Sequence, residues 1–239
     1  MPSSIGHFGT NGPLPCDRCI GKQYNVCHLL EPERQRELFE TGCRHRWDKR
    51  SYLFRAGSPV GAVFKVTSGI VAESRTLADG RRQIIAFFLP GDICGYLETD
   101  GRHAFDGEAI TTAETCSFNR ERFGGFVNRN NDVAEEMRRN LADRLKMAGA
   151  HLSVVGQLTS TERVANFVAM MTAAYAARNV QTRPLPLPMK RSDIADYLGL
   201  RLETVSRAFS KLRQGNIIDV NEDEVLILDQ AKLNQLSNR

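Results

Sequence analysis

Long apolar runs are absent from this chain of 239 residues. The longest extends only from Ile84 to Leu89, whereas a membrane-spanning helix needs roughly 20 apolar residues. The first 15 residues also lack the basic start and apolar run of an export signal. We therefore expect a cytoplasmic protein that has no membrane partner.

Catalytic signatures are absent as well. The sequence contains no phosphate-binding G-x-x-x-x-G-K-[ST], no nucleophile motif G-x-S-x-G, no metalloprotease H-E-x-x-H and no dinucleotide-binding glycine fingerprint. The five histidines are scattered rather than clustered. We therefore expect that the protein is not an enzyme. The net charge of +4 permits nucleic-acid binding without requiring it.

Regularly spaced glycines mark the segment from Lys49 to about Phe126. They recur about every eleven residues and separate short β-rich pieces. Strands at this spacing, broken by turn signals, are typical of a β-sandwich or barrel. The pieces are residues 51–54, 62–66, 70–76 and 83–89. Asp79-Gly80 predicts a hairpin turn between the last two.

A single long helix is predicted from Asn131 to about Gln157. Its apolar residues are spaced three or four apart, which places them in one narrow stripe. Such a stripe resembles a coiled-coil seam and predicts pairing with a second copy of the chain. The predicted seam is Met137, Leu141, Leu145, Ala148, Leu152 and Val155.

The last third predicts a helix-turn-helix followed by a hairpin. Two short helices, 191–198 and 202–214, flank Gly199, which supplies the tight turn. Ser192 is expected to cap the first helix. The predicted small core between the helices is Ile194, Ala195, Leu198, Val205 and Phe209. Residues 217–220 and 225–228 alternate as the strands of a β-hairpin wing would.

The second short helix carries polar groups that can read DNA. Glu203, Ser206 and Arg207 share one face because they are three and four residues apart. Arginine can bind guanine O6 and N7, and glutamate can accept from cytosine N4. The residues expected to contact phosphates are Lys190, Arg191, Arg201, Lys211 and Arg213. A plain solvated face is the alternative, but the glycine turn and the hairpin favour a DNA-reading role.

Three cysteines form a compact group of soft metal ligands, Cys16-x2-Cys19-x7-Cys27. A fourth ligand could come from Cys43, Cys94, Cys116 or His28. Thiolates bind both zinc and iron–sulfur centres, so the spacing leaves zinc, a cluster and no metal all open.

The segment from Arg191 to Leu212 resembles the DNA-binding segment of the FNR/FixK branch of the cyclic-AMP-receptor (CRP/FNR) superfamily. Glu203, Ser206 and Arg207 match the E-x-x-S-R signature of that branch, and the resemblance extends from residue 16 to about 228. It implies a homodimer that binds double-stranded, palindromic DNA with TTGAT-like half-sites. The family often has a hydroxyl residue where this chain has Arg201, so a cap of the second helix is expected to be lost.

The implied fold is α+β and has four parts. Residues 1–48 are an N-terminal tail and cysteine-rich segment, and residues 49–127 form a β-roll sensory domain. Residues 128–157 form the dimerisation helix, and residues 158–239 form a winged helix-turn-helix domain. The resemblance also implies that the turn of Ala78, Asp79, Gly80 and Arg81 contacts RNA polymerase.

The resemblance implies a role for four of the six cysteines. Cys16, Cys19 and Cys27 match the three N-terminal cysteines of oxygen-sensing members, and Cys116 falls at the position of their fourth. Together they look like the ligands of a [4Fe–4S] cluster in an oxygen- or redox-responsive regulator. The alternatives are zinc, heme or no metal. Cys43 and Cys94 lack matching positions and are expected to be buried or half-buried thiols.

Cyclic nucleotide binding is not expected, although other members of the superfamily bind one. Such sites hold the phosphate with a Gly-Glu pair and a later arginine. Here the corresponding stretches are residues 95–98 and 103–106, which lack that arginine and place Asp106 where it would repel a phosphate. For a heme, no local pattern selects among His28, His45, His103 and His151.

Overall fold

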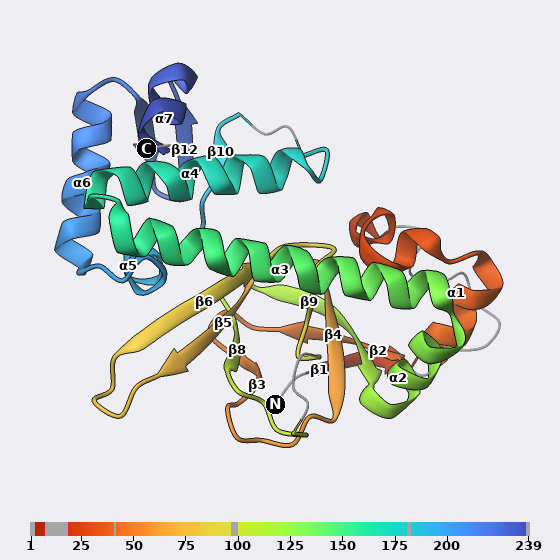
Figure 1. The fold of residues 1–239 in the computed structure, drawn as a ribbon. Helices are drawn as coiled ribbons and strands as arrows, with labels where there is room; N and C mark the ends of the chain where they lie inside the picture. The colour runs from red at the N-terminus through yellow and green to blue at the C-terminus, as the bar shows by residue number, and fades with distance from the viewer. Residues whose placement is uncertain (1–2, 8–18, 41, 97–99, 181–182, 238–239) are drawn as a thin grey trace. The chain divides into compact units, whose positions relative to one another are not determined.

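The computed structural model describes residues 3–7, 19–40, 42–96, 100–180 and 183–237. The chain divides into two compact units, Met1–Leu145 and Lys146–Arg239. Figure 1 shows the helices and strands of both units. Within the described ranges, no helix is long and apolar enough to cross a membrane.

Two antiparallel sheets form the body of the first unit. The four-stranded sheet has the order β3-β8-β5-β6, made of β3 (Tyr52–Phe54), β8 (Asp106–Ala109), β5 (Val71–Thr76) and β6 (Arg82–Phe88). The five-stranded sheet has the order β1-β2-β9-β4-β7, made of β1 (Ser3–His7), β2 (Gly42–Trp47), β9 (Ala113–Asn119), β4 (Ala62–Ser68) and β7 (Ile93–Cys94).

Apolar side chains from both sheets share one core, so the sheets pack face to face. Its aromatic members are Trp47, Phe54, Phe64 and Phe88, and Phe54 stacks on Phe64 with ring centroids 5.7 Å apart. Gly107 lies against the ring of Phe54, where an added Cβ would be only 2.5 Å away. The backbone of β8 can approach this ring only because residue 107 is a glycine.

The four predicted β-rich pieces correspond to β3, β4, β5 and β6, with small differences at their ends. The predicted turn at Asp79-Gly80 is confirmed. Gly80 has φ +84°, and the Leu77 amide donates to the Arg81 carbonyl at 2.8 Å. The Asp79 carboxylate also accepts from the Arg81 side chain at 2.7 Å, which lowers the pKa of Asp79.

Strands β1 and β2 lie before residue 49, in the part that the sequence assigned to a tail and cysteine-rich segment. Their polar composition explains the difference. In β2, Arg44 and Arg46 both pair with Glu114 of β9, and the Arg46 nitrogen lies 3.7 Å from the carboxylate. These arginines balance charge across the sheet, so β2 does not show the alternating pattern of an amphipathic strand.

Short helical turns connect β1 to β2 and cover one end of the five-stranded sheet. They are the 3₁₀ turns η2 (Ile20–Gln23) and η3 (Asn25–Leu29) and the helix α1 (Pro32–Phe39). Pro32 occupies the first helical position of α1, where a proline is well tolerated. After β9 follow α2 (Arg120–Arg129) and the long α3 (Asn131–Gln157).

The second unit contains the helix-turn-helix and a three-stranded sheet. Its remaining elements are α4 (Ser160–Ala176), β10 (Leu185–Pro186), α5 (Arg191–Leu198), α6 (Leu202–Gln214), β11 (Ile218–Asn221), β12 (Glu224–Ile227) and α7 (Gln230–Ser237). The sheet order is β10-β12-β11. Helix α4 begins with a hydroxyl cap, in which Thr159 and Glu162 form a capping box.

Candidate DNA interface and cysteine site

Helices α5 and α6 meet at a left-handed glycine. Gly199 has φ 62° and ψ 38°, a conformation that glycine adopts without strain. The five residues predicted to form the core between these helices are all buried. The helix-turn-helix predicted from the sequence is therefore confirmed. Both helices begin and end at the predicted residues.

The cap of α5 differs from the prediction. Ser192 lies inside the helix, and the N-cap position belongs to Lys190. The carboxylate of Asp193, which is only 1% exposed, accepts from the Lys190 amide at 3.1 Å. An acidic group in the first turn also interacts favourably with the positive end of the helix dipole. The acceptor that stabilises this end is thus one residue beyond the predicted one.

The predicted base-reading face of α6 is open to solvent. Glu203, Ser206 and Arg207 are all exposed. The Ser206 hydroxyl donates to the Leu202 carbonyl at 3.0 Å, so its oxygen can still accept a hydrogen bond. Arg201, the N-cap residue of α6, makes no side-chain cap hydrogen bond, in agreement with the expected loss of a cap.

The five predicted phosphate contacts fall into two groups. Lys190, Arg201 and Lys211 are exposed. The guanidinium of Arg191 lies 3.5 Å above the Phe209 ring, and burial lowers its pKa. Arg213 forms an ion pair of 3.1 Å with Asp219 of β11. The first three are therefore the better candidates for direct contact with a phosphate.

The C-terminal part of α3 packs against α5 within the second unit. His151 donates from Nε2 to the Tyr197 carbonyl at 3.0 Å, and the two rings stack at 4.1 Å. Burial lowers the pKa of His151, and the positive charge of Arg163 lowers it further. Burial also raises the pKa of Tyr197 to about 12. Sequence reasoning missed this contact because no local pattern singles out His151.

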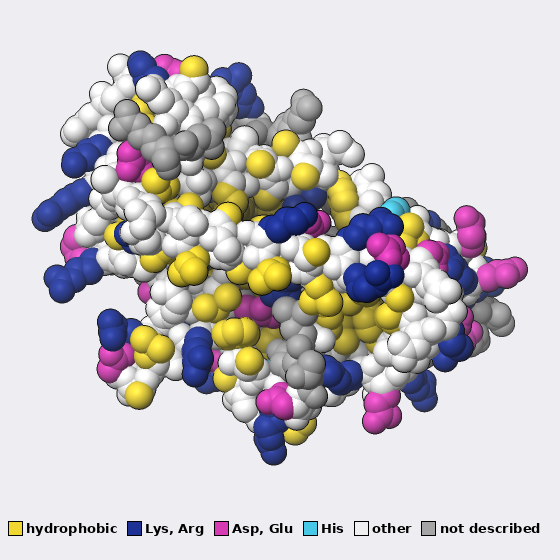
Figure 2. All heavy atoms as spheres, in the orientation of Figure 1, with side chains coloured by type: hydrophobic (Ala, Val, Ile, Leu, Met, Phe, Trp, Pro, Cys, Tyr) yellow, Lys and Arg dark blue, Asp and Glu magenta, His cyan; other side chains and the backbone are white. Residues whose placement is uncertain are grey.

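The predicted seam on α3 divides into a buried start and an exposed remainder. Met137 is 8% exposed and packs with Val133 in the core of its own unit. By contrast, Leu141, Leu145 and Leu152 are 41%, 75% and 73% exposed. Apolar side chains reach the surface along this helix in Figure 2. Ala148 is also exposed and Val155 half-buried.

Arg144 lies beside this seam and reaches into the β-roll. Its guanidinium pairs with the buried Glu73 of β5 at 2.8 Å and lies 4.7 Å above the Phe88 ring. Burial raises the pKa of Tyr96, and the Arg144 charge partly offsets that effect. Arg144 is therefore a half-buried anchor of α3, with its side chain 23% exposed.

Two of the predicted cluster cysteines share one apolar core. Cys27 of η3 is 4% exposed and Cys116 of β9 is 6% exposed, and both belong to the cluster that includes Phe39 and Phe118. Cys19 is half-exposed at the start of η2. Cys16 lies outside the described residues. Among those that are described, no three His, Cys, Asp or Glu side chains are grouped closely enough to hold a metal ion.

The cysteine-rich segment is fastened to the five-stranded sheet between Cys19 and Cys27. Buried Lys65 of β4, which lies opposite Cys116 in the sheet, donates to the Tyr24 carbonyl at 2.8 Å. The Asn25 amide donates to the Gly91 carbonyl at 3.0 Å. The segment that carries two predicted ligands is therefore held on the sheet that carries another, and the soft donors fit a thiolate-bound centre.

Cys43 and Cys94 have the burial that was expected of them. Cys94 of β7 is fully buried in the core between the sheets, and Cys43 of β2 is half-buried. Neither belongs to the apolar cluster that contains Cys27 and Cys116.

The stretch that replaces the nucleotide-phosphate site is filled by its own side chains. His103 is 4% exposed and stacks on Phe54 at 4.2 Å. The Asp106 carboxylate pairs with Arg55 at 3.1 Å and accepts from the Ala56 amide at 2.9 Å. Leu97, Glu98 and Thr99 lie outside the described residues.

A β-roll followed by a long helix and a winged helix-turn-helix defines a class of DNA-binding transcription regulator, not an enzyme. Two family models match the chain in that order. Residues 44–130 match the cyclic nucleotide-binding domain, and residues 162–236 match the Crp-like helix-turn-helix domain.

Comparison with individual relatives identifies the family within this class of regulators. The chain is 32% identical over 237 residues to the nitrogen fixation regulation protein FixK of Bradyrhizobium diazoefficiens, covering 99% of each chain. It is 29% identical to the transcriptional activator protein FnrL of Cereibacter sphaeroides, covering 91% of this chain and 90% of the other. The solved structure of FixK2 from Bradyrhizobium japonicum is 33% identical, with a TM-score of 0.76 over 82% of this chain and 96% of that one. The chain belongs to the CRP/FNR family of transcription regulators, in its FixK-like branch.

Proposed function

We propose that this regulator responds to oxygen or redox state through a [4Fe–4S] cluster held by Cys16, Cys19, Cys27 and Cys116. The observation that carries the proposal is the shared apolar core of Cys27 and Cys116, which are far apart in sequence. A bound cluster would supply an oxygen-sensitive centre. The chain supplies thiolate ligands, and the surrounding apolar side chains limit the access of water to them.

Purification without oxygen tests the proposal. We expect a broad visible absorbance shoulder, together with iron and sulfide that are lost in air. Cys116→Ser should abolish iron uptake, whereas the matched variants Cys43→Ser and Cys94→Ser should retain it. Full iron content in Cys116→Ser would refute the ligand assignment. Zinc without sulfide, or the intense Soret band of a heme, would support the alternative centres.

The proposed target is a palindrome with TTGAT-like half-sites, bound by a homodimer. We assign Arg207 to a guanine, Glu203 to the cytosine of the opposing strand, and Ser206 to a neighbouring thymine or phosphate. A good bidentate pair contributes about 1–3 kcal/mol of discrimination. Glu203→Ala should relax the preference at one base position in a randomised-site selection, and an unchanged motif would contradict the assignment. Lys211→Ala should weaken all sequences alike.

We further infer that the turn of Ala78, Asp79, Gly80 and Arg81 contacts RNA polymerase. The ion pair between Asp79 and Arg81 leaves both side chains exposed, at 52% and 77%. Substitution of Asp79 should preserve DNA binding but lower transcription from a target promoter. Normal transcription would refute this role.

Cyclic nucleotides are not proposed as ligands. Two contacts support this: His103 stacks on Phe54, and Arg55 is already paired with Asp106, whose negative charge would repel a phosphate. Addition of cyclic AMP should therefore leave DNA affinity unchanged. An increase in affinity would show that a phosphate is bound elsewhere in the β-roll.

A further inference from the structure

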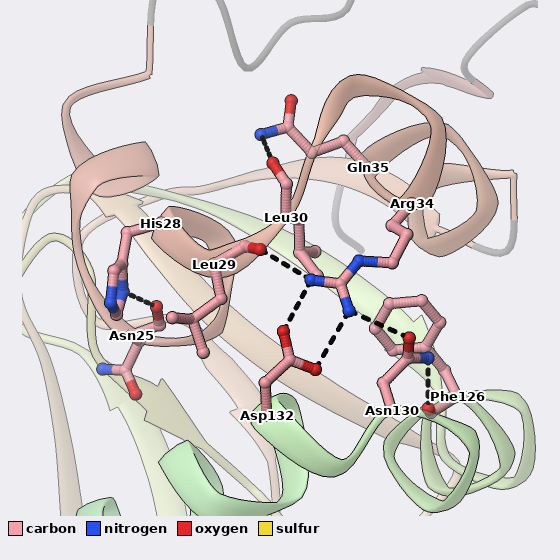
Figure 3. Close-up of polar contacts among 9 residues, drawn as sticks. All are labelled: Asn25, His28, Leu29, Leu30, Arg34, Gln35, Phe126, Asn130 and Asp132. Carbon is pink, nitrogen blue, oxygen red and sulfur yellow. Dashed lines mark hydrogen bonds and ion pairs between the residues drawn. The ribbon is translucent and has the colours of Figure 1, made fainter.

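One arginine of α1 contacts the cysteine-rich segment directly. Arg34 donates from Nη2 to the Leu29 carbonyl at 2.6 Å (Figure 3). Leu29 ends η3, two residues after Cys27. The next residue of α1, Gln35, is 3% exposed and donates to the Leu30 carbonyl at 2.7 Å. Two adjacent side chains of α1 therefore hold the end of the segment that contains Cys27.

The same guanidinium also holds the start of α3. Its Nη1 and Nη2 atoms bind Oδ1 and Oδ2 of Asp132 at 2.9 Å and 2.6 Å. Asp132 lies in the first turn of α3. Nη1 also donates at 3.1 Å to the amide oxygen of Asn130, whose nitrogen donates to the Phe126 carbonyl. One side chain thus connects the cysteine-rich segment, the end of α2 and the start of α3.

The arrangement of these bonds matters more than their energy. The side chains of Arg34 and Asp132 are 31% and 44% exposed, and partly exposed ion pairs contribute little to stability. Two parallel bonds between a planar guanidinium and a carboxylate nevertheless fix relative orientation. Because Nη2 is shared by Leu29 and Asp132, a shift of the Leu29 carbonyl changes the geometry that remains for Asp132.

We infer that Arg34 is a positioning residue that transmits the state of the cysteine-rich segment to the N-terminal turn of α3. The inference rests on the proposed function, since it requires that the segment changes when its centre is lost. Movement at Cys27 displaces the Leu29 carbonyl, and the guanidinium then no longer holds Asp132 in its present orientation. The start of the predicted dimerisation helix is thereby released.

The test compares DNA affinity of anaerobic and air-exposed protein. For the wild type we expect a ratio within roughly 5–150-fold, the usual range of coupling between two sites. Arg34→Gln should retain iron and absorbance but bring the ratio close to one. Hydrogen exchange of the amides at 132–136 should respond to air in the wild type but not in this variant.

Arg129→Gln is the matched control. Arg129 of α2 pairs with Glu37 of α1 at 2.7 Å, so the variant removes an arginine–carboxylate pair from the same helix but leaves Leu29 and Asp132 unchanged. Its affinity ratio should equal that of the wild type. Arg34→Lys retains the charge but lacks the planar fork. If charge pairing alone were sufficient, this variant would restore the full ratio, and the inference would be overturned.

The outcomes separate the inference from the proposed function. A wild type without iron, and without a response to air, overturns the proposed function and the inference with it. A wild type with iron and a response, together with an unchanged ratio in Arg34→Gln, overturns the inference alone. Loss of iron from Arg34→Gln also overturns it, because Arg34 would then be needed to form the centre rather than to transmit its state.

Discussion

Replacement of Leu145 by glutamate should convert the protein into a stable monomer. Leu145 is 75% exposed in the single chain, so the substitution removes almost no contact from the protomer. Leucine and glutamate are both good helix formers. An exposed substitution of this kind usually changes stability by less than about 0.5 kcal/mol. The intrinsic stability of the folded protomer should therefore be almost unchanged, and any fall in the thermal midpoint should reflect loss of the dimer.

The effect on the dimer follows from the area that pairing would bury. Each buried leucine contributes about 1.5–3 kcal/mol, and a symmetric dimer buries one from each protomer, or about 3–6 kcal/mol in total. Because each 1.4 kcal/mol changes an equilibrium constant about tenfold, the dissociation constant should rise roughly 10²- to 10⁴-fold. A buried, unpaired carboxylate would weaken pairing further.

Sedimentation at micromolar concentration measures this effect, alongside binding to a palindromic DNA site. Met147→Glu is the matched control, since Met147 is 59% exposed on the same helix but lies outside the seam. The control should remain dimeric. A dimeric Leu145→Glu protein that binds the palindrome with wild-type affinity would show that the interface lies elsewhere. The air-exposed wild type should also retain substantial dimer, because the seam positions carry no acidic residue.

Three further predictions concern the stability of each unit. The pKa of His151 is lowered, so the folded state favours the neutral ring. The free energy of unfolding in urea should therefore fall as the pH drops below about 6.5. This pH dependence should be weaker in His151→Gln. Asp193→Ala should destabilise the second unit by about 1 kcal/mol through loss of the helix cap, whereas Ser192→Ala should have little effect, and equal thermal shifts would contradict the observed cap. Gly107→Ala should cost about 1–3 kcal/mol by overpacking against an aromatic ring, while Gly61→Ala, which has open space, should be nearly neutral in denaturant titrations.

Local sequence patterns were sufficient to predict the elements whose structure depends on neighbouring residues. The ends of α5 and α6 match the prediction because Gly199 marks the turn and the apolar residues keep helical spacing on both sides. The Asp79-Gly80 turn was predictable for the same reason. The predicted cap at Ser192 failed by one position, since a serine and an aspartate in the first turn offer similar acceptors and only tertiary burial selects between them.

Long-range pairing was not predictable from these patterns. Arg34 and Asp132 are 98 residues apart, and Arg144 and Glu73 are 71 apart. Neither pair leaves a periodic signal, because a charged residue on a helix usually indicates a solvated face. Met137 shows the converse limit. It continues the spacing of the seam, yet it is buried in the core of its own unit. Periodicity identified the stripe but could not identify where the protomer core ends.

Two arginines of β2 pair with one carboxylate of β9, so these three residues should not tolerate substitution equally. Arg44 and Arg46 both contact Glu114, so either arginine can be lost while the other still compensates the negative charge. Glu114 has no such substitute in this group, and its side chain is only 20% exposed. Its loss would leave two like charges on one strand without their common partner. The redundancy lies with the cations, so neutral substitutions in this group should be confined to the arginines.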